Sequence, residues 1–450
     1  MSKPCGASRD HHVGSASVAV DGRRRRFGWS KRPSVSLVAA ATKAFLMPWL
    51  IRECLSCLAS TSPGGREEER PEIWHCTRSP IVRLQRCCEQ RSGRSQQGGQ
   101  YDCDGSGTGE AVNIREAKLQ QTLPVVVTVI EAGPIEQQVC LLVESLRCWG
   151  GRLAEAPVIA IKPRFGPRIS SATHTVLERL NVEYLSIQRN DSFQWFPWLN
   201  KTAAVRHIAA GRPGTIIWLD ADVLVLNEPS ELLLDPLDPN SPQFAACASD
   251  KNIGTAHDDD EFAPYFRAAC QTLGIDFTSL PYVLTEKERI PVRAYWNSGV
   301  YAFASSSGFA ELHHDFTLSL IEKGIGSHES KLFFSDQISL GLAAHHLGLT
   351  RKNLPWNHNY AVQPRDVDAL LREAGKNVCI LHYHGCLWPS SFEKFCHGLS
   401  FHRPDVATWL RDRGPLLTST MSGVTRFHRK ILELYRQRQE SVALRHCRFY

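Results

Sequence analysis

The sequence lacks the cysteine patterns that mark a zinc site or a disulfide framework. Its 15 cysteines are odd in number and irregularly spaced, and seven of them lie before residue 104. The pair Cys54-Leu-Ser-Cys57 has no second pair downstream, so a chance occurrence explains it better than a metal or redox site does. Cysteine usage therefore leaves the cellular compartment undetermined.

Excess positive charge is missing from most of the chain. The net charge of the 450 residues is +6, but residues 1–120 hold 19 Lys and Arg against 12 Asp and Glu. The rest of the chain holds 33 against 34. Because a nucleic-acid-binding surface needs an excess of cations, the body of the chain gives no reason to expect a nucleic-acid partner.

A long uninterrupted apolar run is also missing. The nearest approach is 34–51, which is shorter than the roughly 20 apolar residues of a membrane span. Lys43 stands near its centre, where a charge costs about 2.5–3.5 kcal/mol. Basic residues precede the run and a polar spacer follows it, a layout that suits a membrane anchor with a cytosolic amino end. A targeting presequence or an unfolded extension are the alternatives.

The run 34–51 belongs to an amino-terminal leader, residues 1–120, which differs from the body in composition. It contains four consecutive arginines, Arg23–Arg26, and a stretch rich in Gly, Ser and Gln, 92–108. Such a composition buries too little apolar surface to fold, so we expect mostly disorder. The location is left open between the cytoplasm and a membrane-anchored, Golgi-like one.

Residues 121–420 show the pattern of an α/β domain. Short apolar, β-branched runs predict buried strands, and stretches with helical spacing lie between them. The strands are expected at 123–130, 156–162, 182–188 and 214–220, and the helices at 136–149, 169–181 and 199–210. This alternation predicts a mainly parallel central sheet flanked by helices.

Two aspartates, Asp220 and Asp222, interrupt the apolar stretch IIWLDADVLVL, 216–226. Ligands gather beyond the carboxyl ends of parallel strands, and alternate residues of an extended segment point the same way. Because buried carboxylates are costly unless they are neutralised, the pair suits a divalent cation, Mn²⁺ or Mg²⁺. The alternative is a solvated turn, since Asp-x-Asp often occurs by chance.

A glycine-rich, basic phosphate loop is absent after the first apolar run. The chain there reads Glu131-Ala-Gly133-Pro-Ile-Glu136, with one glycine and no Lys or Arg. A nucleotidyltransferase also uses a parallel sheet and an acid-bound metal, but it normally has such a loop. The segment therefore counts against that class of enzyme.

Four further stretches join the Asp-x-Asp motif in a larger pattern. They are YWNSGVYAF (295–303), FFSDQISLGLA (333–343), LPWNHNYAV (354–362) and ILHYHG (380–385). Their order and spacing resemble those of glycosyltransferase family eight, the glycogenin and bacterial galactosyltransferase type. The resemblance covers about 123–400. It implies a GT-A nucleotide-diphospho-sugar transferase fold and a retaining enzyme.

For the metal, the resemblance implies that Asp220, Asp222 and His382 bind Mn²⁺ or Mg²⁺, which clamps the diphosphate of a nucleotide-sugar. A neutral imidazole beside two carboxylates suits manganese. His384 is the neighbour that could be mistaken for His382. A core histidine is the alternative for His382, because it follows the apolar run 378–381.

The resemblance also implies a set of donor-binding residues, namely Lys201, Asp220, Asn297, Ser298, Gly299 and Gly385. It places Asp336 and Gln337, as the catalytic residues, beneath the anomeric carbon of the sugar. Each assignment has an ordinary alternative. Lys201 would be solvated on an amphipathic helix, 297–299 would form only a turn, and Asp336 would cap a helix.

One motif departs from the family pattern. The family continues from its His-x-x-Gly turn into Lys-Pro-Trp, whose lysine holds the diphosphate, whereas this chain has Trp388 and Pro389 there. Lys394 lies further along and is the candidate substitute. The missing lysine leaves room for a different donor or a weakened enzyme.

The predicted function is thus a metal-dependent glycosyltransferase that moves a sugar, with retention, from a nucleotide-sugar to a glycan, protein or small-molecule acceptor. A UDP-hexose donor follows from the resemblance alone. The alternative is a catalytically inactive transferase-like fold that binds a sugar nucleotide or a partner protein.

The carboxyl-terminal tail, residues 421–450, holds seven Lys and Arg against two Glu. Its apolar residues Ile431, Leu432, Leu434 and Tyr435 predict an amphipathic helix. Such a helix would dock on the body, pair with another subunit or lie on an anionic membrane surface.

Overall fold

The computed structural model describes residues 124–367, 377–417 and 422–450. The expected leader, 1–120, and the candidate anchor at 34–51 lie outside these residues. Within the described part of the chain, no helix combines the length and the apolar character that a membrane crossing needs.

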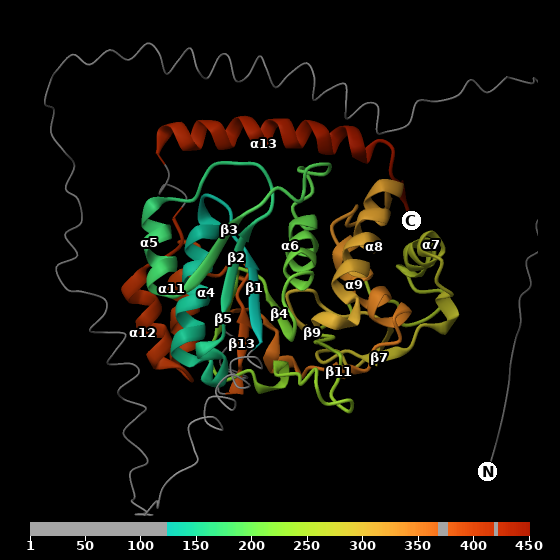
Figure 1. Cartoon of the computed structure of the whole chain (residues 1–450), viewed down its shortest axis with the longest axis horizontal. Helices are drawn as coiled ribbons and strands as arrows, with labels where there is room; N and C mark the ends of the chain where they lie inside the picture. Colours follow the sequence, from blue (N-terminus) through green and yellow to red (C-terminus); the bar gives the residue numbers. More distant parts are fainter. Residues whose placement is uncertain (1–123, 368–376, 418–421) are drawn as a thin grey trace, which may run out of the picture. The chain divides into compact units, whose positions relative to one another are not determined.

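A seven-stranded sheet forms the centre of the fold (Figure 1). In spatial order its strands are β11 (Arg351–Asn353), β6 (Phe244–Ala246), β9 (Val300–Ala304), β4 (Thr215–Leu219), β1 (Val125–Val129), β2 (Val158–Lys162) and β3 (Val182–Ser186). Strand β9 runs antiparallel to both of its neighbours, and every other neighbouring pair is parallel. The predicted mainly parallel sheet is therefore confirmed, and strands β1 to β4 fall within the predicted ranges.

The sheet is buried on both faces because alternate side chains of each strand point to opposite sides. In β1, Val125 and Val127 join one apolar cluster and Val126 joins the other. The first cluster is covered by α6 (Leu199–Ala209), α7 (Ala263–Leu273), α8 (Phe309–Lys323) and α9 (Ser335–His346). The second is covered by α4 (Pro134–Trp149) and α5 (Ser171–Arg179). The result is a helix–sheet–helix sandwich of three layers.

A small sheet stands beside the second face. Its strands, in order, are β12 (Tyr360–Ala361), β13 (Ile380–His382) and β5 (Val223–Val225). A third apolar cluster joins this sheet to α11 (Phe392–Ser400) and α12 (Pro404–Arg413). Only 220–222 separates β4 of the large sheet from β5 of the small one. The two acids of interest therefore lie where the two sheets meet.

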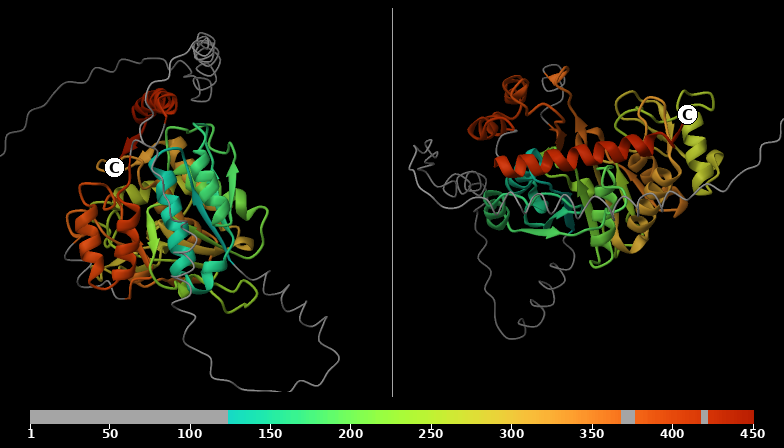
Figure 2. Two further views of the ribbon diagram at one scale, coloured as in Figure 1. Left: turned by 90° about the vertical axis from the view of Figure 1, so that its left-hand side faces the viewer. Right: turned by 90° about the horizontal axis from the view of Figure 1, so that it is seen from above.

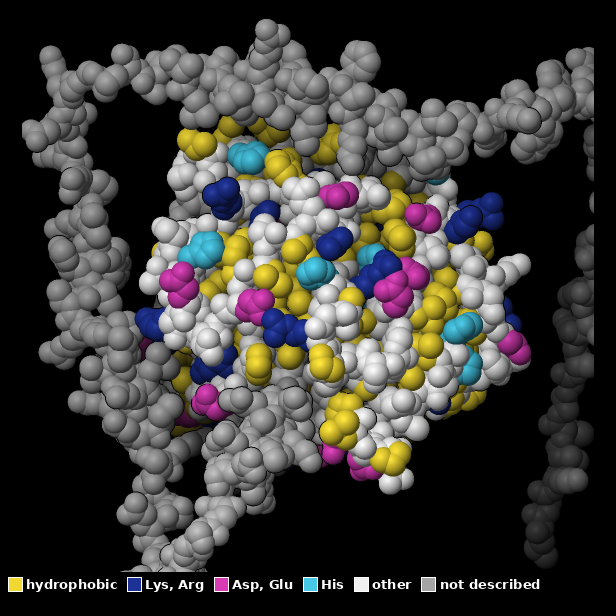
Figure 3. Space-filling model, viewed as in Figure 1, with side chains coloured by type: hydrophobic (Ala, Val, Ile, Leu, Met, Phe, Trp, Pro, Cys, Tyr) yellow, Lys and Arg dark blue, Asp and Glu magenta, His cyan; other side chains and the backbone are white. Residues whose placement is uncertain are grey.

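The remaining elements lie at the edges of the fold. Strand β7 (Tyr282–Leu284) pairs antiparallel with β8 (Pro291–Arg293), and β10 (Ile325–Gly326) pairs parallel with the terminal strand β14 (Arg448–Phe449). The helix that precedes β14 is α13 (Gly423–Leu444), a single straight helix on the outside of the fold (Figures 1 and 2). Its first turn is capped by Ser422, whose hydroxyl accepts from the Thr425 N–H at 3.2 Å. On the face seen in Figure 3, charged side chains of both signs are interspersed.

Candidate functional site

The antiparallel strand β9 brings two distant motifs together. Leu219, the last residue of β4, pairs with Val300, the first residue of β9. The next residue, Asp220, donates its backbone N–H to the carbonyl of Gly299 at 2.9 Å. The carboxyl end of a parallel strand thus meets the amino end of its antiparallel neighbour. This register places the first aspartate beside the Asn-Ser-Gly segment.

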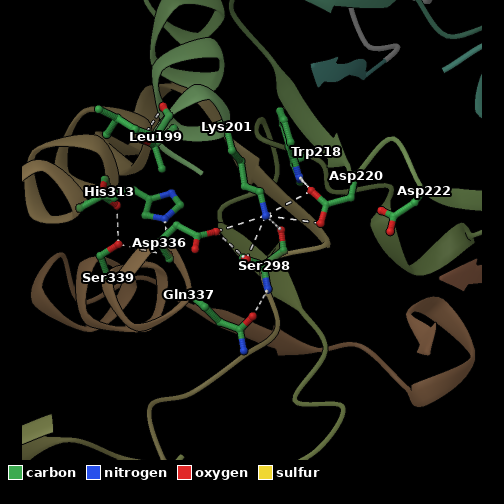
Figure 4. A network of polar contacts seen from close by, with 12 residues as sticks. Leu199, Lys201, Trp218, Asp220, Asp222, Ser298, His313, Asp336, Gln337 and Ser339 are labelled. Atoms are coloured by element: carbon green, nitrogen blue, oxygen red, sulfur yellow. Dashed lines mark hydrogen bonds and ion pairs between the residues drawn. The ribbon is translucent and has the colours of Figure 1, made fainter. Parts of the chain in front are cut away.

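Lys201 lies at the centre of the resulting polar network (Figure 4). Its ammonium group is 3.1 Å from Asp220 Oδ1 and 3.2 Å from Asp336 Oδ2. It also donates to the carbonyl and the hydroxyl of Ser298, at 3.0 Å each. The side chain is only 9% exposed. The solvated-surface alternative for Lys201 is therefore wrong, because this lysine is a buried cation shared by two carboxylates.

Asp336 and Gln337 approach the same segment from the first turn of α9. The Ser298 hydroxyl donates to Asp336 Oδ2 at 2.8 Å, and the Ser298 N–H donates to Gln337 Oε1 at 3.4 Å. Helix α9 has Phe334 at its N-cap position and no side-chain cap hydrogen bond. Asp336 therefore does not cap the helix, and its 3%-exposed carboxylate contacts Lys201 instead.

The charges of this network support one another. Burial by itself would lower the pKa of Lys201, but the carboxylates of Asp220 and Asp336 outweigh it and raise the pKa above its usual value. Burial raises the pKa of Asp220, and the positive charge of Lys201 opposes this only in part. The lysine therefore stays charged, and its charge keeps two acids in one site.

Asp222 belongs to a second cluster, and in Figure 4 no hydrogen bond or ion pair joins it to the Lys201 network. Strand β13 is antiparallel to β5, with His382 opposite Val223. This register brings His382 Nε2 to 3.0 Å from Asp222 Oδ1. His382 is buried, but the hydrogen bond shows that it does more than fill the core.

Both ring nitrogens of His382 face oxygen atoms. Nε2 faces Asp222, and Nδ1 lies 3.2 Å from Asn359 Oδ1. Burial by itself would lower the pKa of His382, but the Asp222 carboxylate raises it. Burial would raise the pKa of Asp222, but His382 outweighs it and lowers that pKa to about 2. A positive charge between Nε2 and the carboxylate is thus favoured, whether a proton or a metal ion supplies it.

His384 completes a group of metal-ligand type. Its ring stacks on that of His382 with the centroids 4.1 Å apart, and its Nδ1 is 3.8 Å from Asp222 Oδ2. The ligand atoms of Asp222, His382 and His384 all lie within 4.8 Å of one another. Burial, together with His382, lowers the pKa of His384 to about 4, so its ring is neutral at physiological pH. Its backbone φ is 43°, a strained value for a residue with a side chain.

Asp220 lies outside this group of three, although the sequence predicted it as a ligand. Lys201 contacts its carboxylate, and the Trp218 indole N–H donates to Oδ1 at 2.8 Å. Its role as a metal ligand stays a prediction. His384, named at first only as a neighbour of His382, takes the third position in the described group.

Gly299 joins the two clusters. A Cβ atom on this residue would lie 2.7 Å from His382 Cε1 and 3.2 Å from Asp220 Oδ2. Only glycine therefore allows the β4–β9 edge and the histidine to approach this closely. Gly299 thus lies close both to His382 and to Asp220, the carboxylate that Lys201 contacts.

Gly299→Ala is expected to displace His382, and with it the histidine–Asp222 pair. Forcing a methyl group into this contact should cost about 1–3 kcal/mol of unfolding free energy. Activity should fall by about a hundredfold, because catalytic geometry tolerates little displacement. Urea denaturation and a turnover assay measure the two effects. The control is Gly211→Ala, where a Cβ atom meets nothing within 4 Å; equal effects of both substitutions would contradict the argument.

The other predicted residues have simpler surroundings. Asn297 Oδ1 accepts from the Ser249 N–H at 2.8 Å, so its amide fixes a neighbouring loop as well as forming part of the turn. Gly385 lies in the turn after His384, with open space beside it apart from Pro364 and Trp388 at ordinary contact distances. Lys394 is exposed on α11.

Three residues of the site were not singled out in the sequence. Trp218 stands two positions before Asp220 on the same face of the strand, so the alternation of β4 could have indicated it. Tyr295 accepts a hydrogen bond from the Gln337 amide through its hydroxyl. Asn359, the residue directly before β12, orients His382 through its contact with Nδ1. The last two contacts span 42 and 23 residues, and no local pattern points to them.

Buried His313 contacts the backbone of Asp336 and should make the stability of the fold sensitive to acid. Its Nε2 donates to the Asp336 carbonyl at 2.8 Å, and among the described residues its Nδ1 has no hydrogen-bond partner. Burial lowers the pKa of His313 to about 4, below the unfolded value of about 6.5. Between these values the unfolded chain binds a proton that the folded chain rejects. The contribution of His313 to the free energy of unfolding is therefore fully present above about pH 6.5 and is lost as the pH drops toward 4.

The expected loss from His313 is about 3 kcal/mol across this interval. Urea denaturation at several pH values measures it. His313→Gln should reduce the slope of unfolding free energy against pH, whereas His257→Gln, at an exposed histidine, should leave the slope unchanged. An unchanged slope for His313→Gln would contradict the argument, because it would show that folding does not change the proton affinity of this histidine.

The central part of the chain is similar to a known domain family. Residues 126–348, just under half of the chain, match the family model described as the Rhodobacterales glycosyltransferase domain. The match includes Lys201, Asp220, Asp222 and Asp336, but it ends before His382. No curated protein sequence matches the chain. The family-model match supports a glycosyltransferase, and thus a transferase enzyme.

Solved structures give a further comparison. The chain is similar to the apo structure of the bifunctional glycosyltransferase WbbM, with 13% sequence identity and a TM-score of 0.37. The likeness covers 65% of this chain and 52% of that one. The chain thus spans about half the length of WbbM.

Proposed function

We propose that the chain is a metal-dependent glycosyltransferase that moves a hexose from a nucleotide-sugar to an acceptor, with retention, on a GT-A fold of the family-eight type. The observation that carries the proposal is the pair of clusters around Gly299. One holds a buried lysine between Asp220 and Asp336. The other has a carboxylate and two imidazoles arranged as metal ligands. Both lie at the carboxyl end of β4, where ligands of α/β sheets bind.

The second cluster fits a divalent cation such as Mn²⁺ or Mg²⁺. Asp222 is ionised and His384 is neutral at physiological pH, as ligands must be. Asn359 Oδ1 at His382 Nδ1 favours the tautomer that presents the Nε2 lone pair toward Asp222. A mixed carboxylate and imidazole set suits Mn²⁺ better than Mg²⁺, which prefers oxygen. When bound, the ion would act as a Lewis acid toward the leaving diphosphate.

The residues of the first cluster would position the donor sugar. Lys201 holds the Asp220 and Asp336 carboxylates and the Ser298 backbone in fixed relative positions. Asp336 is almost fully buried and ion-paired, which favours a positioning role over nucleophilic attack on the anomeric carbon. We propose that Gln337 and the Ser298 segment lie against the sugar. Retention would then follow from attack by the acceptor on the face from which the diphosphate departs.

A second function is favoured by one observation, the tryptophan at the position of the diphosphate lysine. Trp388 is half-buried in the turn that follows Gly385, and its backbone N–H donates to the Gly385 carbonyl at 3.3 Å. Exposed Lys394 lies on the next helix. Without a lysine at the turn, the fold would bind a sugar nucleotide without turning it over. This binding protein is the alternative to the enzyme.

The two functions are separated by hydrolysis of nucleotide-sugars in the absence of acceptor. The full-length protein is incubated with a panel of UDP-, GDP- and ADP-sugars, with Mn²⁺, with Mg²⁺ and with EDTA. Slow nucleotide release from one donor, lost with EDTA, is expected and would identify the donor. NMR of the product with an accepted glycan would test retention. Mn²⁺-dependent nucleotide binding without turnover would favour the binding protein. The absence of both turnover and nucleotide binding would overturn the site assignment.

A further inference from the structure

Helix α13 contacts the body with one side only. The His428 ring lies 6.1 Å from that of Phe165, and Arg436 donates to the Phe165 carbonyl at 2.5 Å. At the other end, Ala443 and Leu444 pack against the cluster of Trp195 and its neighbours. None of the 22 residues of the helix is buried. One long side of the helix therefore faces away from the fold.

The outward side carries an apolar stripe. Val424 is 74% exposed, Phe427 65% and Leu434 55%. Phe427 and Leu434 are seven residues apart, so they lie on the same side of the helix, two turns apart. Lys430 lies between them, three residues after Phe427, and Arg438 follows Leu434 by four. The stripe is thus an exposed aromatic and aliphatic surface with one cation beside Phe427 and another beside Leu434.

The helix as a whole is basic. From Gly423 to Arg445 it contains six Lys and Arg against Glu433 and Glu440. Glu433 lies 3.4 Å from Lys430, but both side chains are at least half exposed, so water weakens the pair. Basic helices with Phe and Leu on an exposed side bind at the interface of anionic lipid bilayers. There the apolar residues enter the boundary of headgroups and acyl chains, and the cations contact the lipid charges.

Other partners fit this surface less well. Residues 1–120 carry 19 Lys and Arg against 12 Asp and Glu, so electrostatics disfavours the leader as a cover for α13. A second copy of the chain would bring two basic helices together, which is unfavourable for the same reason. We propose that the outward side of α13 lies on an anionic lipid membrane surface. Phe427 and Leu434 enter the interface, and Lys430 and Arg438 contact anionic headgroups.

Hydroxyl-radical footprinting of the full-length protein tests the proposal at single residues. Side-chain oxidation is measured by mass spectrometry with phosphatidylserine-containing vesicles, with phosphatidylcholine vesicles and without lipid. With anionic vesicles, oxidation of Phe427 and Leu434 should fall by at least about threefold. Leu237, which is 82% exposed on a distant loop, is the internal control and should not change. Because the readout is local, membrane binding by the basic leader does not affect its interpretation.

Vesicle sedimentation of variants gives the second measurement. Phe427→Ser with Leu434→Ser should weaken binding to anionic vesicles by about tenfold or more, and Leu237→Ser should not. Unchanged oxidation of Phe427 in vesicle-bound protein would overturn the proposal. Oxidation that is already low without lipid would also overturn it. If that protection vanished on dilution, a second copy would be the occupant; if it persisted, the leader would be.

Discussion

Asp222→Asn is expected to lower Mn²⁺-dependent nucleotide release by at least about a thousandfold, which corresponds to about 4 kcal/mol of transition-state stabilisation. The pKa of Asp222 is about 2, so the carboxylate is fully charged at neutral pH. Asparagine keeps the shape of the side chain but removes the charge that a divalent cation needs. The measurement is nucleotide release by the full-length protein across a range of Mn²⁺ concentrations.

The matched control for this prediction is Asp258→Asn. Asp258 is also a carboxylate paired with a cation, Arg293 at 3.0 Å, but its side chain is 64% exposed. It should keep the turnover and the Mn²⁺ dependence of the unmodified protein. Thermal melting without metal would show whether the Asp222 variant is folded. Folded Asp222→Asn with full, Mn²⁺-dependent activity would remove Asp222 from the metal site.

Lys201→Met is expected to lower the free energy of unfolding by about 3–5 kcal/mol at neutral pH. The substitution keeps most of the side-chain volume but leaves the Asp220 and Asp336 carboxylates without their shared cation. Removing one partner of a buried ion pair costs far more than the pair itself contributes. Because protonation relieves unpaired carboxylates, the loss should shrink as the pH is lowered. Urea denaturation as a function of pH measures both effects.

Two further variants distinguish lost charge from lost packing. Lys201→Met combined with Asp336→Asn removes one of the unpaired charges, so it should recover part of the stability. Lys287→Met, at an exposed lysine, should change the free energy of unfolding by less than about 0.5 kcal/mol. If the double variant is no more stable than Lys201→Met alone, the carboxylates are not the cause of the loss.

Local sequence was sufficient for much of the fold. The runs around Val126, Ile159 and Ile217 are β-branched and bounded by helical patterns, and burial of parallel strands on both faces requires such runs. The same logic located Asp220 and Asp222 at the carboxyl end of a strand. Hydrophobic periodicity did not show which strands are neighbours. The antiparallel direction of β9 was therefore not predicted.

The contacts of the site depend on that missing information. Lys201, Ser298 and Asp336 meet only because β9 lies beside β4, and their separations in sequence are 97 and 38 residues. The surface alternative for Lys201 was reasonable for an amphipathic helix, but the two carboxylates offset the cost of burying the ammonium group. His384 was named only as a neighbour of His382 and not as a ligand, because it is the backbone turn with positive φ that brings its ring onto His382. No residue pattern encodes that turn.

The three residues that separate β4 from β5 have a mechanical consequence. Asp220 is anchored in the large sheet, and Asp222 is tied through His382 to the small sheet and to the helices that pack on it. Any ligand that contacts both acids would therefore add a link between the large sheet and the small sheet, beside the apolar cluster that they share. Occupancy should then slow protease cutting of the small-sheet half more than that of the large-sheet half. Digestion patterns would thus report on binding even where no reaction occurs.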